Sequence, residues 1–215
     1  MKTLKPLFFL FLTLSAITFC IVYIIPKIKN HKKYSEADSK GGLDMVEINY
    51  GKAIDSAANV FELPPEYFKA LCMLECTGRK EFPERFEPHV LDRLKEVKFQ
   101  RLNNYEHVTP EMLSDANEEA LKNLASSWGP FQLMGYKCLL LDIKVRDIRG
   151  DDAVFYGVKW IEMTYGEKLK AKRFKDAFHI HNTGKPYPLS GKPLTYDPDY
   201  VNRGLAYMKH FGYKF

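Results

Sequence analysis

The sequence predicts a mainly α-helical globular domain with little β-structure, preceded by one transmembrane helix. Residues 7–25 form a run of 19 residues without a charge, and later stretches repeat apolar residues at helical spacing. No stretch alternates for long between apolar and polar residues, as an extended sheet requires. We therefore expect a membrane anchor with a basic flank over residues 1–33, a polar tether over 34–43 and one globular domain over 44–215.

The apolar run at residues 7–25 is long enough to cross the hydrocarbon core of a bilayer as a helix. The alternative is a cleaved signal peptide, with Lys2 and Lys5 as its basic start. A signal peptide needs a shorter apolar core and a cleavage site of small residues, and the segment FCIVYIIP offers no such site. The length of the run favours an uncleaved, single-pass anchor.

The net charge of +5 belongs to the N-terminal segment. Residues 1–33 hold six of the 32 Lys and Arg and none of the 27 Asp and Glu, so 26 basic residues face 27 acidic ones in residues 34–215, a net of −1. The basic flank suits anionic lipid headgroups. Because the domain is nearly neutral, the positive net charge of the chain does not indicate a nucleic-acid partner, and we expect none.

The domain can bury one core, because the chain is 46% hydrophobic and contains 15 Phe and 13 Tyr. Three cysteines lie after the anchor: Cys72, Cys76 and Cys138. Cys72 and Cys76 are four residues apart, on neighbouring turns of one helix, so we expect packed thiols and not a disulfide. An odd count without a C-x-x-C spacing predicts neither a disulfide framework nor a zinc site.

The expected helices follow from apolar spacing and from turn residues. A first helix is predicted over 44–60, where apolar residues recur from Met45 to Ala57. A second begins at Pro64-Pro65 and ends before Gly78. The later helices are expected within residues 85–97, from near 115 to Gly129, over 151–170, over 173–184 and over 197–212.

Glu75 interrupts the apolar pattern of the second helix. With Phe68 as the reference on a helical wheel, Leu71, Cys72 and Glu75 follow at three, four and seven positions, so all lie in the stripe that should face the core. Burial and the nearby C-terminal end of the helix both disfavour a negative charge, which predicts a raised pKa for Glu75. An acid that stays protonated near neutral pH can donate a proton to a leaving group. The alternative is an ordinary surface ion pair with Arg79, four residues on.

Four stretches are too particular to be surface filler. They read Glu75-Cys76-Thr77-Gly78, Phe86-Glu87-Pro88-His89, Ser127-Trp128-Gly129-Pro130-Phe131-Gln132-Leu133-Met134-Gly135 and His181-Asn182-Thr183-Gly184. Taken together and in this order, they resemble the bacterial and phage N-acetylmuramidase family of the lysozyme superfamily. That family shows an acid followed by a small residue and Gly, then Phe-Glu-x-His, Ser-Trp-Gly-x-Phe-Gln-x-Met-Gly and Tyr-Asn-Gly. The resemblance covers roughly residues 66–210, and its third block is the most specific.

The resemblance implies a lysozyme-like fold that cleaves the β-1,4 bond between N-acetylmuramic acid and N-acetylglucosamine in peptidoglycan. It makes Glu75 the catalytic acid. Gln132, with its neighbouring backbone, would bind the acetamido sugar, Ser127 would line the same segment, and Asn182 would lie opposite across a groove. An amide side chain can hold an N-acetyl group without competing for the proton. The alternative for Gln132 and Asn182 is turn chemistry, and we expect Trp128 in the core or the groove wall.

Glu87 and His89 also lie near the groove in the family pattern, so the resemblance implies that they contact the substrate. Glu87 could be a second catalytic carboxylate, acting as a base or as an electrostatic partner. The alternative is a structural hydrogen-bonding pair that braces the loop of Glu75. His179 and His181 would point apart on a helix and lack a third ligand, so we expect no metal and no cofactor.

The sequence departs from the family pattern at Cys76, where the family has Ser, and at His181, where it has Tyr. Lytic transglycosylases share the fold, often show Tyr-Asn-x-Gly, and give 1,6-anhydro products with one Glu acting first as acid and then as base. Hydrolysis and transglycosylation therefore both remain open. A third alternative is a catalytically inactive muropeptide-binding protein on the same fold, since fold does not fix function.

Charge and function make opposite predictions about topology. Lys27, Lys29, Lys32 and Lys33 outnumber the basic residues before the anchor, which would keep the domain in the cytoplasm. A glycan-strand substrate lies outside the cytoplasmic membrane, so we expect a single-pass inner-membrane protein whose domain faces the periplasm or cell wall. Local wall cleavage suits an envelope-spanning secretion or conjugation apparatus as partner.

Overall fold

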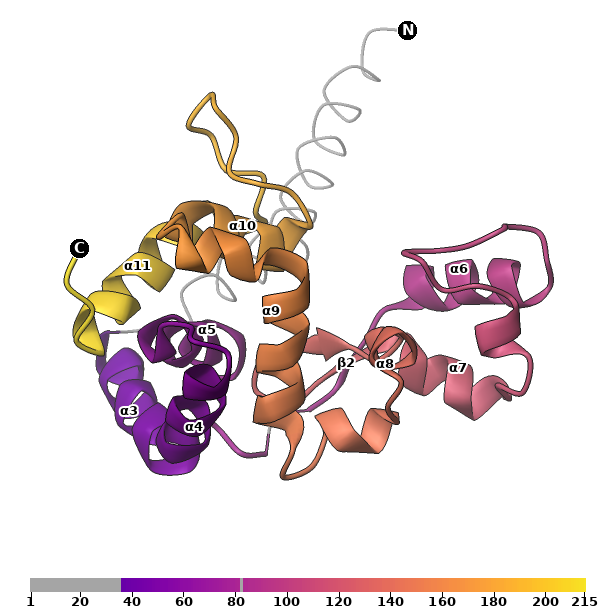
Figure 1. The fold of residues 1–215 in the computed structure, drawn as a ribbon, viewed down its shortest axis with the longest axis horizontal. Helices are drawn as coiled ribbons and strands as arrows, with labels where there is room; N and C mark the ends of the chain where they lie inside the picture. The colour runs from indigo at the N-terminus through magenta and orange to yellow at the C-terminus, as the bar shows by residue number, and fades with distance from the viewer. Residues whose placement is uncertain (1–35, 82) are drawn as a thin grey trace, which may run out of the picture. The chain divides into compact units, whose positions relative to one another are not determined.

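The computed structural model describes residues 36–81 and 83–215 (Figure 1). The chain divides into two units, Met1–Gly41 and Gly42–Phe215, and only residues 36–41 of the first are described. The anchor predicted at residues 7–25 lies outside the described residues. Within residues 36–81 and 83–215, no helix is both long and apolar enough to cross a membrane.

The described chain is mainly helical, as the sequence predicts. Its α-helices are α3 (Glu36–Val46), α4 (Lys52–Val60), α5 (Pro65–Cys76), α6 (Pro88–Lys98), α7 (Glu118–Leu124), α8 (Lys137–Leu141), α9 (Ala153–Lys170), α10 (Phe174–Thr183) and α11 (Tyr200–His210). A π-helical turn η2 (Glu47–Gly51) joins α3 to α4, and two 3₁₀ turns are η3 (Glu111–Leu113) and η4 (Val145–Ile148). The strands are β1 (Arg85–Phe86), β2 (Ser126–Trp128) and β3 (Leu133–Met134).

The helix α3 begins at Glu36, inside the segment that we expected to be a tether. Gly42 in this segment has a packing role. A Cβ added at Gly42 would lie 2.7 Å from Cε of Met73, so only glycine lets α3 approach α5 this closely. Gly42 is therefore a helix-packing residue.

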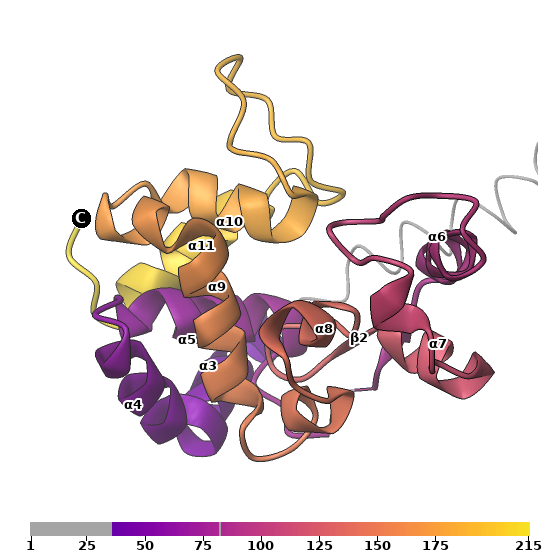
Figure 2. The ribbon, with the colours of Figure 1, turned by 45° about the vertical axis from the view of Figure 1, so that its right-hand side comes forward.

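The helix α5 lies in the main core of the unit Gly42–Phe215. Phe68, Leu71 and Cys72 are fully buried there, α5 packs on α4 and α11, and α9 contacts α4 and α10 (Figure 2). The helix predicted over residues 151–170 is confirmed as α9, although Tyr165 (φ −144°, ψ 21°) interrupts its helical geometry. This core carries the C-terminal end of α5, where Glu75 lies.

The predicted helix from near residue 115 to Gly129 is wrong at its C-terminal end. The helix α7 ends at Leu124, and Ser126–Trp128 forms the middle strand of an antiparallel three-stranded sheet in the order β1-β2-β3. In the sheet, Ser127 pairs with Arg85 on one side and with Met134 on the other. Pairing with β1 and β3 fixes these residues as a strand, and tryptophan is a residue that strands favour.

Two smaller cores lie beside the helical one. The first joins α6, η3 and α7 and includes Val90, Leu94 and Leu113. The second joins the sheet to α8 and η4, and it contains Trp128, which is 8% exposed, so its expected place in the core or groove wall is confirmed as the core. A guanidinium group, that of Arg149, lies 4.3 Å from the centre of the Trp128 ring.

Candidate active site

The C-terminal end of α5 presents Glu75 at the edge of the main core. The stripe that leads to it is buried as predicted, but the Glu75 side chain keeps 17% of its exposure. The helix stops directly afterwards, because Thr77 takes a left-handed conformation (φ 56°) and Gly78 follows at φ 70°. Glu75 is thus mostly desolvated but still reaches solvent.

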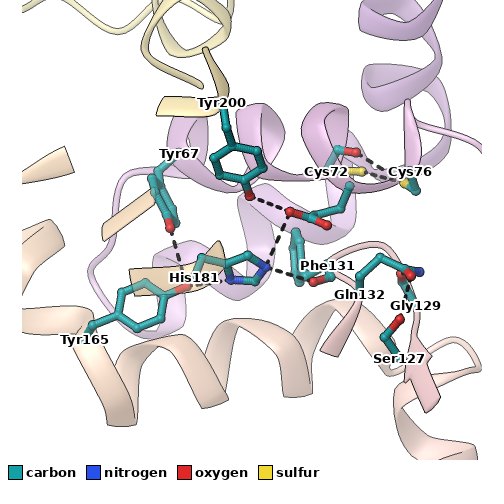
Figure 3. Close-up of polar contacts among 11 residues, drawn as sticks. Tyr67, Cys72, Cys76, Ser127, Gly129, Phe131, Gln132, Tyr165, His181 and Tyr200 are labelled. Carbon is teal, nitrogen blue, oxygen red and sulfur yellow. Dashed lines mark hydrogen bonds and ion pairs between the residues drawn. The ribbon is translucent and has the colours of Figure 1, made fainter. Parts of the chain in front are cut away.

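The closest polar partner of Glu75 is Tyr200, the first residue of α11 (Figure 3). The Tyr200 hydroxyl donates a hydrogen bond to Oε1 of Glu75. Tyr200 itself is 6% exposed, so the bond lies in a largely water-excluded place. A donor held there stabilises the ionised form of the carboxyl.

Burial raises the pKa of Glu75 from its ordinary 4.5 to about 7. The hydrogen bond from Tyr200 and the positive charges of Arg85 and Arg203 oppose this rise. Arg79, the partner in the surface ion-pair alternative, is not among the groups that shift the pKa of Glu75. The predicted direction is confirmed, and the cations near Glu75 come from β1 and α11.

His181 reaches Glu75 from α10, with Nε2 3.8 Å from Oε1. Its Nε2 lies 3.0 Å from the carbonyl oxygen of Phe131, which can only accept, so Nε2 carries the proton. Nδ1 then accepts a hydrogen bond from the Tyr165 hydroxyl at 2.8 Å. The Tyr67 hydroxyl in turn donates to the Tyr165 hydroxyl at 3.4 Å (Figure 3).

His181 is a neutral ring at physiological pH. Burial, reinforced by the positive charge of Lys137, lowers the pKa of His181 from 6.5 to about 3. The 3.8 Å approach to Glu75 is therefore a contact between a neutral ring and a carboxyl group, and not an ion pair. The ring joins α9, α10 and the segment after β2 around the acid.

Gln132 and Ser127 are joined in the turn between β2 and β3. The Ser127 hydroxyl donates to Oε1 of Gln132 at 2.7 Å, and Nε2 of Gln132 donates to the carbonyl of Gly129 at 3.2 Å. The turn is tight: Gln132 has φ 48°, and a Cβ at Gly129 (φ 71°) would lie 2.5 Å from the Ile148 carbonyl oxygen. The amide of Gln132 is thus oriented by its own turn, with one N–H still free of these bonds.

Glu87 and His89 lie at the start of α6. Glu87 forms an ion pair with Arg85 at 2.6 Å, and Nδ1 of His89 lies 3.6 Å from its other oxygen. His89 is 71% exposed at its side chain, whereas Glu87 is 19% exposed. Arg85 connects this pair to the acid, because its charge also lowers the pKa of Glu75.

Asn182 lies in the last turn of α10 and is exposed, one residue from His181. His179, on the same helix, turns away from the acid. Its Nε2 accepts from the backbone N–H of Leu194 at 2.9 Å, and its Nδ1 lies 2.6 Å from the carbonyl of Lys185. The two histidine rings therefore point in different directions and bond to different segments, as their spacing predicts. Within residues 36–81 and 83–215, no group of three or more His, Cys, Asp and Glu is placed to hold a metal ion.

Sequence reasoning missed the partners that surround Glu75. Tyr200, Arg203 and Tyr165 are contributed by helices far along the chain, and they belong to none of the four stretches quoted above. His181 was visible only as the residue that replaces an expected Tyr. The described structure shows that this position matters because its ring spans Phe131 and Tyr165.

No protein-family model, no curated protein and no solved structure matches this chain. A carboxyl group with a pKa of about 7, partly open to solvent and held by a phenol, can give up a proton near neutral pH and take one back.

Proposed function

We propose that this chain is a glycosidase that cleaves the β-1,4 bond between N-acetylmuramic acid and N-acetylglucosamine in peptidoglycan. The observation that carries the proposal is the raised pKa of Glu75, about 7, on a carboxyl that still reaches solvent. Lysozyme uses the same device, a glutamic acid in an apolar pocket. The resemblance of the four stretches to the muramidase family supplies the substrate class.

In the proposed reaction, protonated Glu75 donates its proton to the glycosidic oxygen as the bond to the anomeric carbon breaks. The leaving sugar departs as an alcohol, water adds to the oxocarbenium-like centre, and the proton that this water loses passes to solvent. Glu75 is left as a carboxylate. Tyr200, Arg85 and Arg203 stabilise that carboxylate, since each lowers the pKa of Glu75. Burial raises the pKa of Glu75 and these three groups lower it, so the resulting pKa of about 7 lets the acid both hold and release its proton near neutral pH.

Substrate contacts in the proposal come from the turn after β2. Gln132 has its side-chain oxygen fixed by Ser127, which orients the amide before a sugar arrives. The second N–H of the amide and the left-handed backbone at Gln132 are suited to an acetamido group. Asn182 is proposed to contact the sugar from the end of α10, and Glu87 and His89 from the start of α6. A lysozyme-like fold, with a short sheet and the acid at a helix end, is part of the same proposal.

A lytic transglycosylase is the second candidate, and one observation favours it. Among the described residues, the groups that shift the pKa of Glu75 are one phenol and two guanidinium groups, and no second carboxylate. Glu87, the other acid of the motif, is engaged by Arg85. A single acid that later acts as base suits return of the sugar's own 6-hydroxyl in place of water. Mass spectrometry of the products distinguishes the two reactions, because the 1,6-anhydro product lacks one water.

A zymogram on purified peptidoglycan tests whether the chain is an enzyme. Wild type, Glu75→Gln and Glu66→Gln are compared, the last being a control on the first turn of the same helix. We expect clearing by wild type and by Glu66→Gln and none by Glu75→Gln. Equal clearing by all three would exclude Glu75 as the acid. No clearing by any, with binding to peptidoglycan retained, would leave the non-enzymatic muropeptide-binding function.

We further propose that the domain faces the periplasm or cell wall from an inner-membrane anchor, because its substrate lies there. Wall cleavage beside an envelope-spanning secretion or conjugation apparatus is a setting in which tethering would confine the damage. Protease added to intact spheroplasts checks the topology. Digestion of the domain is expected, and a protected domain would contradict this placement.

A further inference from the structure

We propose that the C-terminal part of the domain docks on an anionic lipid bilayer through one face, here called the docking face. It consists of the loop at residues 185–196, the basic residues Lys172, Arg173 and Lys175 at the start of α10, and the tail at 209–215. The loop extends away from α10, as Figures 1 and 2 both show. This proposal is independent of the glycosidase chemistry at Glu75.

The loop presents apolar side chains to solvent. Leu189 is completely exposed, and Leu194 is 62% exposed. Beside the loop, Leu189, the 68% exposed Phe215 and the buried Phe174 line a groove of about 470 Å³. Exposed apolar clusters of this kind mark interaction surfaces, because a soluble domain gains nothing by hydrating them.

The loop is held in this shape by bonds to α10. The backbone N–H of Tyr187 donates to Oδ1 of Asp176 at 3.0 Å, and the Tyr187 hydroxyl donates to the carbonyl of Gly191 at 3.0 Å. The buried ring of His179 holds both ends, at the Lys185 carbonyl and the Leu194 N–H. These bonds fix the conformation of the loop, and in that conformation Leu189 is exposed.

The charge around the loop is strongly positive. Residues 172–196 contain five Lys and Arg and a single acid, Asp176, although residues 34–215 as a whole carry a net charge of −1. Asp176 is buried and pairs with Arg173 at 2.5 Å. The tail at 209–215 adds Lys209 and Lys214 without an acid. The first acids after the loop are Asp197, which pairs with Arg203, and Asp199.

A bilayer with anionic headgroups fits this combination best. Lysines around an apolar tip can contact lipid phosphates while leucine and phenylalanine enter the acyl boundary. An anionic polymer such as a nucleic acid would use the charges but not the exposed Leu189. A protein partner would need an apolar pocket matched to the tip. A bilayer accepts both features without shape complementarity.

The test places an environment-sensitive nitrobenzoxadiazole label at the loop tip in the full-length chain. Leu189→Cys is labelled in a Cys20→Ser background, because the three remaining cysteines are buried. Ile48→Cys, at a 78% exposed position on η2, is the matched control. Each protein is reconstituted in vesicles of equal parts phosphatidylglycerol and phosphatidylethanolamine, or of phosphatidylcholine alone.

We expect blue-shifted, brighter emission at position 189 in the anionic vesicles only, and unchanged emission at position 48. Replacing Lys175 and Lys192 by Gln should lower the ratio of docked to undocked protein roughly thirtyfold, which corresponds to about 2 kcal/mol. The matched pair Lys52→Gln and Lys122→Gln, also exposed, should leave that ratio unchanged. Equal emission at position 189 in both vesicle types would overturn the proposal. So would a blue shift that requires an added protein.

Discussion

The hydroxyl of Tyr200 donates a hydrogen bond to Oε1 of Glu75, across 125 positions of the sequence. The bond forms because α11 packs along α5, so the start of one helix meets the end of the other. Burial alone would hold the proton on Glu75 too firmly. The hydrogen bond from the phenol opposes this effect and lowers the pKa of the acid towards neutral pH.

Tyr200→Phe should therefore raise the pKa of Glu75. A hydrogen bond to a charged group contributes about 1.5–3 kcal/mol, so the pKa should rise by roughly 1 to 2. The basic limb of the activity profile should move to higher pH by this amount, with a lower maximal rate. The measurement is the initial rate of peptidoglycan cleavage against pH. A lower rate with an unmoved limb would mean that Tyr200 is only structural.

His181→Ala should destabilise the domain, because it leaves the Phe131 carbonyl and the Tyr165 hydroxyl without this partner. Two lost buried hydrogen bonds predict a decrease of about 2–4 kcal/mol in the free energy of unfolding, measured with urea. Asn182→Ala is the neighbouring control, since Asn182 is exposed. It should change stability by less than about 0.5 kcal/mol but raise KM if Asn182 binds sugar. Equal stability of the two variants would contradict the bridging role of His181.

Glu75 and His181 should affect stability with opposite dependence on pH. The folded state holds the extra proton of Glu75 between pH 4.5 and about 7, so this residue lowers stability as the pH rises through that range. The pKa of His181 is lowered from 6.5 to about 3, so the folded state holds fewer protons there and stability rises with pH. The two effects oppose each other where the ranges overlap.

Glu75→Gln should reveal the contribution of His181 to the pH dependence of stability, because the variant lacks the opposing contribution of Glu75. Above neutral pH the variant should be more stable than wild type by roughly 3 kcal/mol, the equivalent of moving a pKa from 4.5 to about 7. Urea unfolding across the pH range measures this difference, with Glu66→Gln as the control that should follow wild type. Parallel curves for Glu75→Gln and wild type would show that the acid is not perturbed by folding.

Gly157→Ala should disturb the site indirectly, by displacing Phe131. A Cβ at Gly157 would lie 2.4 Å from the Phe131 ring, and the carbonyl of Phe131 accepts the His181 bond. We expect a loss of about 1–3 kcal/mol of stability and a reduced cleavage rate, because Phe131 must shift. Gly150→Ala is the matched control, since its Cβ would meet only the Arg146 carbonyl oxygen at 3.4 Å. Unchanged activity in Gly157→Ala would contradict the coupling through Phe131.

The sequence predicts local features of the site better than its assembly. Glu75 could be recognised because one helix carries both the acid and the apolar stripe beside it. Tyr200 could not, because nothing local distinguishes it from the other tyrosines, and only the packing of α11 on α5 brings it to the acid. The packing role of Gly42 could not be predicted for the same reason, because it depends on Met73, which lies on another helix.

Cys76 has a physical role in the fold. Cys76 is fully buried, its thiol donates to the Cys72 carbonyl at 3.3 Å, and the two sulfurs lie 3.6 Å apart. The expected packing of both thiols in the core is confirmed. A thiol suits this apolar position and still makes the backbone bond that a serine hydroxyl could make.

The most direct test of the central claim is the rate of product release from purified peptidoglycan across the pH range, for wild type and Glu75→Gln. If Glu75 is the general acid with a pKa of about 7, the wild-type rate should fall about tenfold for each pH unit above that value, and the variant should show no cleavage at any pH. A wild-type rate that stays constant well above neutral pH, or cleavage by Glu75→Gln at the wild-type rate, would contradict the claim.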